Sequence, residues 1–210
     1  SERLSIQVHP NDEQARTRGQ AQGKSECWMI LEAEPGATLG LGLQRDMGKD
    51  ELRSAALDGS IERLMDWRTV SAGDFIFVPP CTIHAIGAGI SLLEFQQNSD
   101  VTYRLYDYGR PRELHLDDGI AVANPFRFPA ELVHRFGNEQ RTLVDGPHFT
   151  LLQSSCDALT DRLRWIIPLD GEAKAGDDSA GPGACLLVQP YETVEAFGGR
   201  ILIGATYRRP

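Results

Sequence analysis

The first segment of the chain, "LSIQVHPND" (residues 4–12), alternates between apolar and polar residues until Pro10 ends the alternation. Successive side chains of a β-strand point to opposite faces, so this period of two predicts a strand with one apolar face. The apolar positions are Leu4, Ile6 and Val8, and the polar positions are Ser5, Gln7 and His9. The polar face needs partners of its own, which makes it a candidate site.

Short strand-like segments recur along most of the chain and are separated by Gly, Pro or Asp residues. They lie at residues 27–33, 69–80, 89–97, 101–108, 149–155, 163–169, 184–190 and 200–207. Regularly spaced short strands with turn residues between them are typical of β-sandwiches and β-barrels. The pattern therefore predicts a mostly β fold.

Residues 49–67 depart from this pattern because their apolar residues recur at helical spacing. The apolar positions are Leu52, Ala55 and Ala56, and, after Asp58 and Gly59, Ile61, Leu64 and Met65. Ser60 is a suitable N-cap for the second piece. We expect two short helices inserted between strands. We also expect residues 170–184 to form a mobile loop, since they contain no strand-like run.

An internal repeat relates residues 73–94 to residues 183–204 without gaps. Five of the 22 aligned positions are identical: Gly73 and Gly183, Val78 and Val188, Pro80 and Pro190, Gly89 and Gly199, and Leu92 and Leu202. The repeat predicts two β-domains of similar build. His84 falls opposite Val194 and Glu94 opposite Gly204, so a site in the first copy would be lost in the second.

Composition narrows the range of partners and locations. The chain has 210 residues, 41% of them hydrophobic, which allows one large domain or two smaller ones. Its net charge of -9 argues against nucleic acid, for which a basic surface is expected. No apolar run approaches the roughly 18 residues of a membrane helix, and no signal-peptide core precedes the first strand. With four dispersed cysteines, the simplest expectation is a soluble cytoplasmic protein with reduced thiols.

Four polar residues on three expected strands form a candidate metal site. They are Gln7, His9, Glu26 and His84. Two imidazoles, a carboxylate and a neutral oxygen donor suit Zn²⁺ or another first-row divalent ion. The alternative is that each of these residues is a structural polar group satisfied by its local neighbours.

The segment "GDFIFVPPCTIH" (residues 73–84) matches a signature of the cupin superfamily, G-x5-P-x-G-x2-H, with Cys81 in place of the second Gly. In that fold the His lies inside a β-barrel and faces an H-x-H pair on an earlier strand. Here the corresponding pair is Gln7 and His9, which accounts for the polar face of the first strand. Cys81 and His84 also form a Cys-x2-His pair, which leaves Cys81 as an alternative metal ligand.

Four motifs together, "SIQVHPND", "GKSECW", "VPPCTIHAIG" and "EFQQNSDVTYRLYDYGR", resemble type I mannose-6-phosphate isomerases in their short bacterial form. The resemblance implies one Zn²⁺ per chain, and it assigns the ligands, the catalytic residues and a substrate contact. The implied metal ligands are Gln7, His9, Glu26 and His84, the catalytic residues are Arg104, Lys24 and Glu94, and the substrate contact is Ser5. Arg110 is a weaker candidate for substrate binding, its simpler interpretation being a surface cation.

The implied reaction interconverts mannose 6-phosphate and fructose 6-phosphate through a cis-enediol. A metal or a cation must stabilise the developing negative oxygens, and a base must move a proton between C1 and C2. Lys24, near a metal and Arg104, is expected to have a depressed pKa, and Glu94 is the rival base. Alternation within residues 101–108 places Arg104 toward the cavity, where we expect Glu94 as its resting partner.

The resemblance also predicts the domain organisation. We expect two cupin-type jelly-roll barrels: a catalytic, metal-binding domain at residues 1–115, with a helical insertion at about 46–67, and a degenerate, metal-free domain at residues 116–210. Family members carry further residues before the Q-x-H strand, so the chain is expected to be either a truncated or a reduced member. His115, His134 and His148 lie outside every motif and are expected to be surface or structural residues.

The sequence is also compatible with two other functions. One is a non-catalytic cupin that binds a sugar or a sugar phosphate, which would need neither Lys24 nor Arg104. The other is an Fe²⁺ dioxygenase, which would use an open site of two His and one carboxylate and is disfavoured by Gln7 as a fourth ligand. For the isomerase and for the sugar-binding cupin, the expected partner is a small sugar phosphate or sugar rather than nucleic acid or a membrane. The sequence does not determine the oligomeric state.

Overall fold

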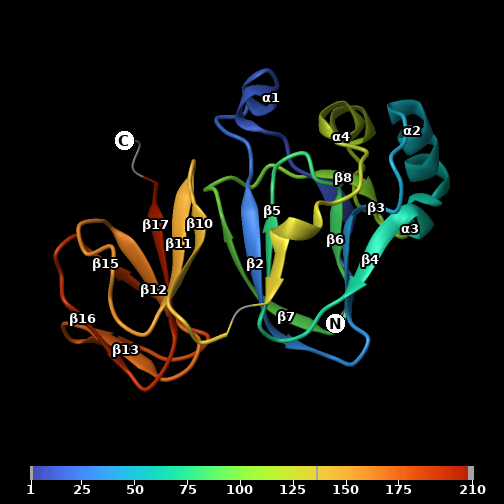
Figure 1. Cartoon of the computed structure of the whole chain (residues 1–210). Helices are drawn as coiled ribbons and strands as arrows, with labels where there is room; N and C mark the ends of the chain where they lie inside the picture. Colours follow the sequence, from blue (N-terminus) through green and yellow to red (C-terminus); the bar gives the residue numbers. More distant parts are fainter. Residues whose placement is uncertain (1, 136, 208–210) are drawn as a thin grey trace. The chain divides into compact units, whose positions relative to one another are not determined.

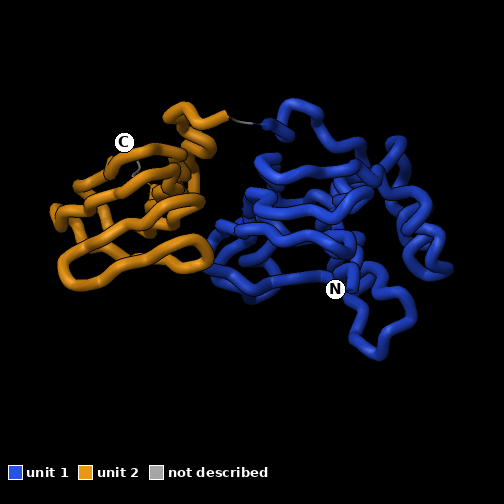
Figure 2. Tube along the Cα trace, turned by 90° about the horizontal axis from the view of Figure 1, so that it is seen from below, with its two compact units in different colours: residues 1–135 blue, residues 136–210 orange. Residues whose placement is uncertain are grey.

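A computed structural model describes residues 2–135 and 137–207. The chain divides into unit 1, residues 1–135, and unit 2, residues 136–210 (Figure 2). Both units consist mainly of antiparallel strands, as predicted (Figure 1). Among the described residues no helix has the length and apolar character of a membrane span.

Unit 1 contains a five-stranded and a four-stranded sheet, with strand orders β4-β3-β6-β1-β8 and β7-β2-β5-β9. The first comprises β1 (Ile6–Val8), β3 (Thr38–Leu43), β4 (Met65–Thr69), β6 (His84–Ile86) and β8 (Tyr103–Tyr106). The second comprises β2 (Glu26–Ala33), β5 (Asp74–Val78), β7 (Ile90–Gln96) and β9 (Val133–Arg135). Apolar side chains from both sheets, including Trp28, Ile76 and Leu41, share one core cluster, so these sheets pack face to face.

Helices join the strands of unit 1 at several points (Figure 1). They are α1 (Asp12–Arg16), α2 (Lys49–Asp58), α3 (Ile61–Leu64), α4 (Leu116–Val122) and the 3-10 turn η1 (Ala130–Leu132). Helices α2 and α3 confirm the predicted helical insertion up to Leu64. Its last residues, 65–67, were predicted wrongly, because Met65 and Trp67 pair with β3 and begin β4.

Helix α4 was not predicted, and it bears on where the first unit ends. Its buried residues Ile120 and Val122 belong to the same core cluster as Leu105 of β8 and Leu52 of α2. Since α4 packs there, the predicted boundary between residues 115 and 116 falls inside unit 1 rather than at its end. The assignment of the two halves as catalytic and degenerate cupin barrels stays a prediction.

Unit 2 contains a five-stranded sheet of order β10-β11-β17-β12-β15 and a three-stranded sheet of order β14-β13-β16. The first comprises β10 (Arg141–Asp145), β11 (Phe149–Ser154), β12 (Arg164–Pro168), β15 (Leu186–Val188) and β17 (Ile201–Thr206). The second comprises β13 (Glu172–Ala175), β14 (Asp178–Ala180) and β16 (Val194–Phe197).

The prediction of a mobile loop at residues 170–184 is wrong, because this segment contains the hairpin of β13 and β14. Ala173, Ala175 and Ala180 are buried in the core of unit 2. Alanine has low strand propensity, and its small side chain gives only a weak apolar signal at the buried positions of the alternation. The small side chains nevertheless fit a tightly packed face, so tertiary packing decides the structure of this segment.

The predicted repeat is visible in the strand order of the two units. The order β7-β2-β5 in unit 1 corresponds to β17-β12-β15 in unit 2, and β6-β3-β4 corresponds to β16-β13-β14. His84 and Val194 begin the corresponding strands β6 and β16, and both are buried. The gap-free alignment slips by one residue at β17, because Ile203 belongs to the core cluster of unit 2 as Leu92 packs against that of unit 1, whereas Leu202 is buried outside that cluster.

Candidate metal centre

Strand β1 separates its apolar and polar side chains as the alternation predicts. Ile6 and Val8 lie in the core of unit 1, whereas Ser5 and His9 are buried on the opposite side with Gln7 between them. Gln7 pairs with His84 of β6 on one side and with Arg104 of β8 on the other. The register of the sheet therefore gathers three of the predicted site residues at one place.

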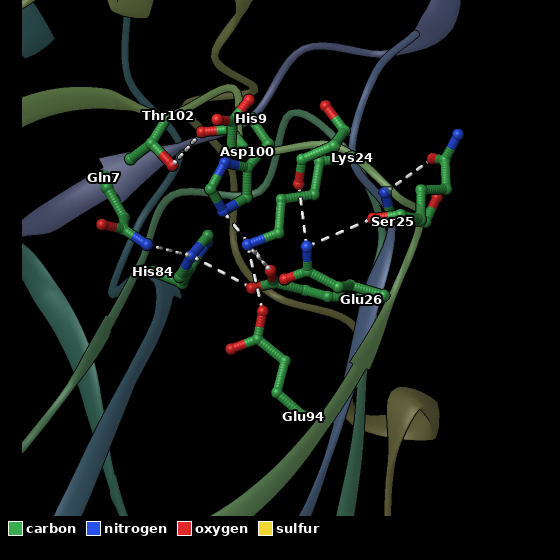
Figure 3. Close-up of polar contacts among 12 residues, drawn as sticks. Gln7, His9, Lys24, Ser25, Glu26, His84, Glu94, Asp100 and Thr102 are labelled. Atoms are coloured by element: carbon green, nitrogen blue, oxygen red, sulfur yellow. Dashed lines mark hydrogen bonds and ion pairs between the residues drawn. The ribbon is translucent and has the colours of Figure 1, made fainter. Parts of the chain in front are cut away.

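His9, Glu26 and His84 converge in the interior of unit 1. One ligand atom of each residue lies within 4.8 Å of the ligand atoms of the other two, and all three side chains are buried. His9 follows β1, Glu26 begins β2 and His84 begins β6, so strands from both sheets of the unit contribute. Figure 3 shows the three side chains pointing toward one another.

Backbone carbonyl groups determine which ring nitrogen of each imidazole faces this centre. His9 Nδ1 lies 2.7 Å from the Val101 carbonyl oxygen, and His84 Nδ1 lies 3.0 Å from the Thr82 carbonyl oxygen. A carbonyl oxygen only accepts hydrogen bonds, so each Nδ1 carries the proton and each Nε2 presents a lone pair. A second hydrogen bond of this kind is how proteins orient metal-binding histidines.

Both Nε2 atoms face the Glu26 carboxylate, at 3.4 Å for His9 and 3.2 Å for His84. Two lone pairs and a carboxylate repel one another unless a proton or a cation lies between them. His9 Nε2 is buried without a hydrogen-bond partner among the described residues. These buried nitrogen and oxygen donors fit a divalent cation such as Zn²⁺.

Burial and charge favour the protonation states that metal binding requires. Burial lowers the pKa of His84 to about 4, so the ring is neutral at pH 7. Burial alone would raise the pKa of Glu26, but the nearby imidazoles and the Lys24 ammonium outweigh it and hold this pKa below its usual range. A neutral imidazole and an ionised carboxylate are the forms that bind metals.

Gln7 lies beside this centre and is oriented by Ser5. Its Nε2 lies 3.2 Å from His84 Nε2, and its Oε1 accepts a hydrogen bond of 3.2 Å from the Ser5 hydroxyl. A half-turn of the amide would exchange the two atoms and present Oε1 to the centre. Gln7, the predicted fourth ligand, therefore lies close to the His84 nitrogen that faces the centre. Ser5, the predicted substrate contact, hydrogen-bonds to Gln7.

Lys24 lies between two carboxylates, with Nζ 2.8 Å from Glu26 Oε2 and 3.0 Å from Glu94 Oε1 (Figure 3). Burial alone would lower the pKa of Lys24, but the charges of Glu26 and Glu94 outweigh it and raise this pKa above its ordinary value. The expected depression of the Lys24 pKa is therefore wrong for this arrangement, because the sequence did not reveal that two carboxylates flank the amine.

Glu94 occupies the position on β7 that pairs with Trp28 of β2. Burial, with a smaller contribution from Glu26, raises its pKa. The resting ion pair expected between Glu94 and Arg104 is wrong, because the partner of Glu94 is Lys24. The spacing between these residues in the chain could not distinguish a lysine just before β2 from an arginine on β8.

Arg104 has few partners in the structure. Its Nη1 donates a long hydrogen bond of 3.5 Å to the Glu113 carbonyl oxygen, and its Nε is buried without a partner among the described residues. Its neighbours Val101, Tyr103 and Leu105 pack in the core, which confirms the predicted apolar face of this segment. Arg104 therefore carries a positive charge that no described carboxylate neutralises, on the strand that pairs with the one carrying Gln7.

Arg110 is held by Asp107. Its Nη2 lies 2.6 Å from Asp107 Oδ1, and Arg112 Nε lies 2.6 Å from Asp107 Oδ2. Asp107 is buried, so these two guanidinium groups neutralise an internal carboxylate at the end of β8. This contact gives Arg110 a structural role, and its predicted role in substrate binding stays a prediction.

Cys81 does not join the candidate metal-binding cluster, which comprises only His9, Glu26 and His84 among the described His, Cys, Asp and Glu residues. Its Sγ faces Gln14, 3.1 Å from Oε1, and its backbone N–H donates to the His9 carbonyl oxygen at 2.7 Å. Its φ of 71° explains why the signature has Gly here. The alternative of a Cys81–His84 metal pair is therefore not supported.

Two contributions to the site were missed at the sequence level. Asn11 and Gln14 form a capping box at the start of α1, and the pattern N-x-x-Q just after the first strand could have indicated it. The Trp28 and His84 rings form a T-shaped contact, with the ring centroids 5.4 Å apart. No sequence signal indicates this contact, because the two residues lie on different sheets.

These features define a class: a mostly β protein with two imidazoles and a carboxylate converging as a candidate divalent-metal site. Comparison with known proteins identifies the relatives. The chain is 39% identical over 157 residues to mannose-6-phosphate isomerase of Streptococcus mutans, covering 70% of this chain and 49% of that protein. It is 40% identical over 161 residues to mannose-6-phosphate isomerase ManA of Bacillus subtilis, covering 70% and 50%.

Solved structures agree with this relationship. The mannose 6-phosphate isomerase of Bacillus subtilis matches with a TM-score of 0.77 at 26% identity, covering 97% of this chain and 72% of that chain. A variant of phosphomannose isomerase from Salmonella typhimurium shares the fold, with a TM-score of 0.73 at 14% identity over 99% and 76% of the two chains.

The resemblance drawn from the motifs is thus confirmed, and the chain is related to the mannose-6-phosphate isomerases. It spans about half the length of the two curated relatives. No family model matches it.

Proposed function

We propose that the protein is a metal-dependent aldose–ketose isomerase that interconverts mannose 6-phosphate and fructose 6-phosphate, with one Zn²⁺ per chain. The observation that carries this proposal is the buried convergence of His9, Glu26 and His84 beside the ion pair of Lys24 and Glu94. The similarity to mannose-6-phosphate isomerases supplies the substrate.

The residues that would hold the ion are Gln7, His9, Glu26 and His84. When bound, the ion supplies Lewis-acid stabilisation to oxygens at C1 and C2 of the sugar. The Val101 and Thr82 carbonyls fix the imidazoles with Nε2 toward the site, so these two donors are held ready for the metal. Gln7 would join them after a half-turn of its amide, and the Ser5 hydroxyl would then accept a hydrogen bond from Gln7 Nε2.

The remaining residues handle the proton and the negative charge. Isomerisation moves a proton from C2 to C1 of the sugar, or back, through a cis-enediol, and this needs one group that accepts and returns the proton. We assign this step to the pair of Lys24 and Glu94, without choosing between them. The unneutralised Arg104 is suited to stabilise an anionic sugar or its phosphate as a planar fork of donors.

Two further residues are proposed to contact the substrate. Ser5 lies next to Gln7, so a bound sugar near the metal would come within reach of its hydroxyl. Arg110 would contribute less than Arg104, because Asp107 already binds its guanidinium.

The test is to incubate the protein with mannose 6-phosphate and to measure fructose 6-phosphate by a coupled dehydrogenase assay. The proposal predicts conversion that is lost after chelation and restored by Zn²⁺. Binding of mannose 6-phosphate without conversion by metal-loaded protein would favour the non-catalytic sugar-phosphate-binding function. Conversion unaffected by complete chelation would contradict the assignment of the metal.

A further inference from the structure

Three successive residues before β2 each donate a backbone hydrogen bond to one of two other segments of unit 1. The Gly23 N–H donates to Asp12 Oδ1 at 2.9 Å, and the Lys24 N–H donates to the Pro10 carbonyl at 3.1 Å. The Ser25 N–H donates to Gln97 Oε1 at 2.7 Å. The segment that carries Lys24 is therefore fixed although it lies outside any strand or helix.

Gln97 contributes to this arrangement with both its backbone and its side chain. Its backbone N–H donates to the Ser25 carbonyl at 3.0 Å, and its side-chain Nε2 donates to Asp12 Oδ1 at 3.2 Å. The side chain is buried, so losing these bonds would leave polar groups without partners. Gln97 directly follows β7, the strand that carries Glu94.

Asp12 links the segment before β2 and the segment after β7 to the start of α1. Its Oδ1 accepts from both Gly23 and Gln97, and Asp12 begins α1, just after the segment that carries His9. Gly23 packs so closely here that an added Cβ would lie 2.4 Å from the Pro10 carbonyl oxygen. One carboxylate thus connects the chain segments that carry His9, Lys24 and Glu94.

We propose that Asp12 and Gln97 are positioning residues that hold the Lys24 ammonium between Glu26 and Glu94. Lysine has a flexible side chain of four carbons, so its end is placed reliably only where its own backbone is fixed. The Asp12–Gln97 contact fixes that backbone relative to Glu94. The structural part of this inference stands alone, whereas its catalytic consequence rests on the proposed isomerase function.

Two pairs of variants separate positioning from general stability. Gln97→Met keeps the length of the side chain but removes its hydrogen bonds to Ser25 and Asp12. Its matched control is Gln153→Met in unit 2, which removes two hydrogen bonds from another buried glutamine to the Gly137 and Glu139 carbonyls. Asp12→Ala removes the shared acceptor, whereas Asp12→Asn retains an oxygen for Gly23 and Gln97.

The chain has only three lysines, Lys24, Lys49 and Lys174, so ¹³C-labelled lysine gives an NMR spectrum with three Cε–Hε signals. Lys24→Met identifies the Lys24 signal by its loss. We expect Gln97→Met and Asp12→Ala to move this signal toward those of the exposed Lys49 and Lys174. We expect Asp12→Asn and Gln153→Met to leave it in place.

In the same samples, zinc content should stay at the parent value. Gln97→Met should lower kcat by about 10²-fold while KM changes far less, the scale expected when a reacting group is misplaced by about 1 Å. Asp12→Asn should restore most of the kcat lost in Asp12→Ala.

An unmoved Lys24 signal in folded Gln97→Met, or in Asp12→Ala if Gln97→Met does not fold, would overturn the inference. A moved signal with unchanged kcat would overturn its catalytic part. If the parent protein has no isomerase activity, the proposed function fails, and the NMR comparison still decides whether Asp12 and Gln97 position Lys24.

Discussion

The imidazole rings of His9 and His84 lie with their centroids 4.9 Å apart, and each donates its Nδ1–H to a backbone carbonyl. The two Nε2 lone pairs are consequently directed at the same Glu26 carboxylate. This relationship turns two buried histidines into a donor set for a cation. Removing either ring should therefore abolish metal binding without removing the strands that carry the two histidines.

His84→Ala should lose the metal. Replacing a residue that only orients a ligand usually costs 10- to 100-fold in metal affinity, so deleting a ligand should cost more than about 100-fold. Elemental analysis and Zn²⁺ titration of the purified variant measure this loss directly. His148→Ala, in unit 2, is the control and should bind Zn²⁺ as the parent does. Equal zinc content in His84→Ala and the parent would exclude His84 as a ligand.

Arg104→Ala should keep its fold and its zinc but lose turnover. No described carboxylate neutralises Arg104, so its removal leaves no buried acidic partner unpaired. We expect kcat/KM to fall by about 10²- to 10⁴-fold, the usual scale for losing one preorganised charge-stabilising group. Steady-state kinetics with mannose 6-phosphate give this value.

The control for Arg104→Ala is Arg68→Ala on β4, at the other edge of the same sheet, where Arg68 pairs with Asp66. It should retain the parent kcat/KM. If folded, zinc-loaded Arg104→Ala turned over at the parent rate, Arg104 would only hold the segment around Glu113.

Asp107→Asn should destabilise unit 1 and make its free energy of unfolding depend less on pH in the acid range. The Arg112 and Arg110 guanidinium groups hold the pKa of Asp107 below its usual range, although burial alone would raise it. The folded state therefore favours the ionised form. The stability that this group contributes is present above its unfolded pKa of about 4 and is lost as pH falls through the lower folded value.

Urea unfolding at pH 7 and at pH 3 measures this effect. At pH 7 the variant should lose about 1.5–3 kcal/mol, the range for hydrogen bonds to charged groups, and the difference from the parent should shrink at pH 3. Asp66→Asn, which breaks a more exposed pair, should lose less than about 1 kcal/mol. A loss at Asp107→Asn that does not depend on pH would contradict the assignment to its charge.

Cys81→Gly should preserve both zinc content and stability. The φ of 71° at Cys81 costs a residue with a Cβ about 1–2 kcal/mol, and glycine avoids this cost. Cys81→Val should be less stable than the parent, because a β-branched residue tolerates this conformation poorly. Thermal unfolding and elemental analysis of the two variants provide the comparison. Loss of zinc in Cys81→Gly would show that the thiol is a ligand after all.

Much of the fold follows from local patterns in the sequence. Period-two alternation located β1, and apolar spacing located α2, because each depends on one buried face. The helix α4 and the hairpin of β13 and β14 escaped prediction. Their apolar residues are few or small, and their structure depends on what they pack against.

The candidate site was predictable as a set of residues but not as a network. The Q-x-H pair and the signature ending at His84 are local patterns, and they are enough to indicate inward-facing ligands. The partner of Lys24 was not predictable, because Glu94 comes from a strand that only the sheet register brings alongside β2. The contacts of Gln97 with Ser25 and Asp12 depend in the same way on tertiary structure.

The most direct test of the proposed function is the isomerase rate of chelated protein as Zn²⁺ is added back stepwise. The rate of fructose 6-phosphate formation from mannose 6-phosphate should rise linearly to one Zn²⁺ per chain and then remain constant. His84→Ala should show no rise under the same conditions. A rate that is independent of added Zn²⁺, or zinc that binds at one equivalent without producing any turnover, would contradict a metal-dependent isomerase site at His9, Glu26 and His84.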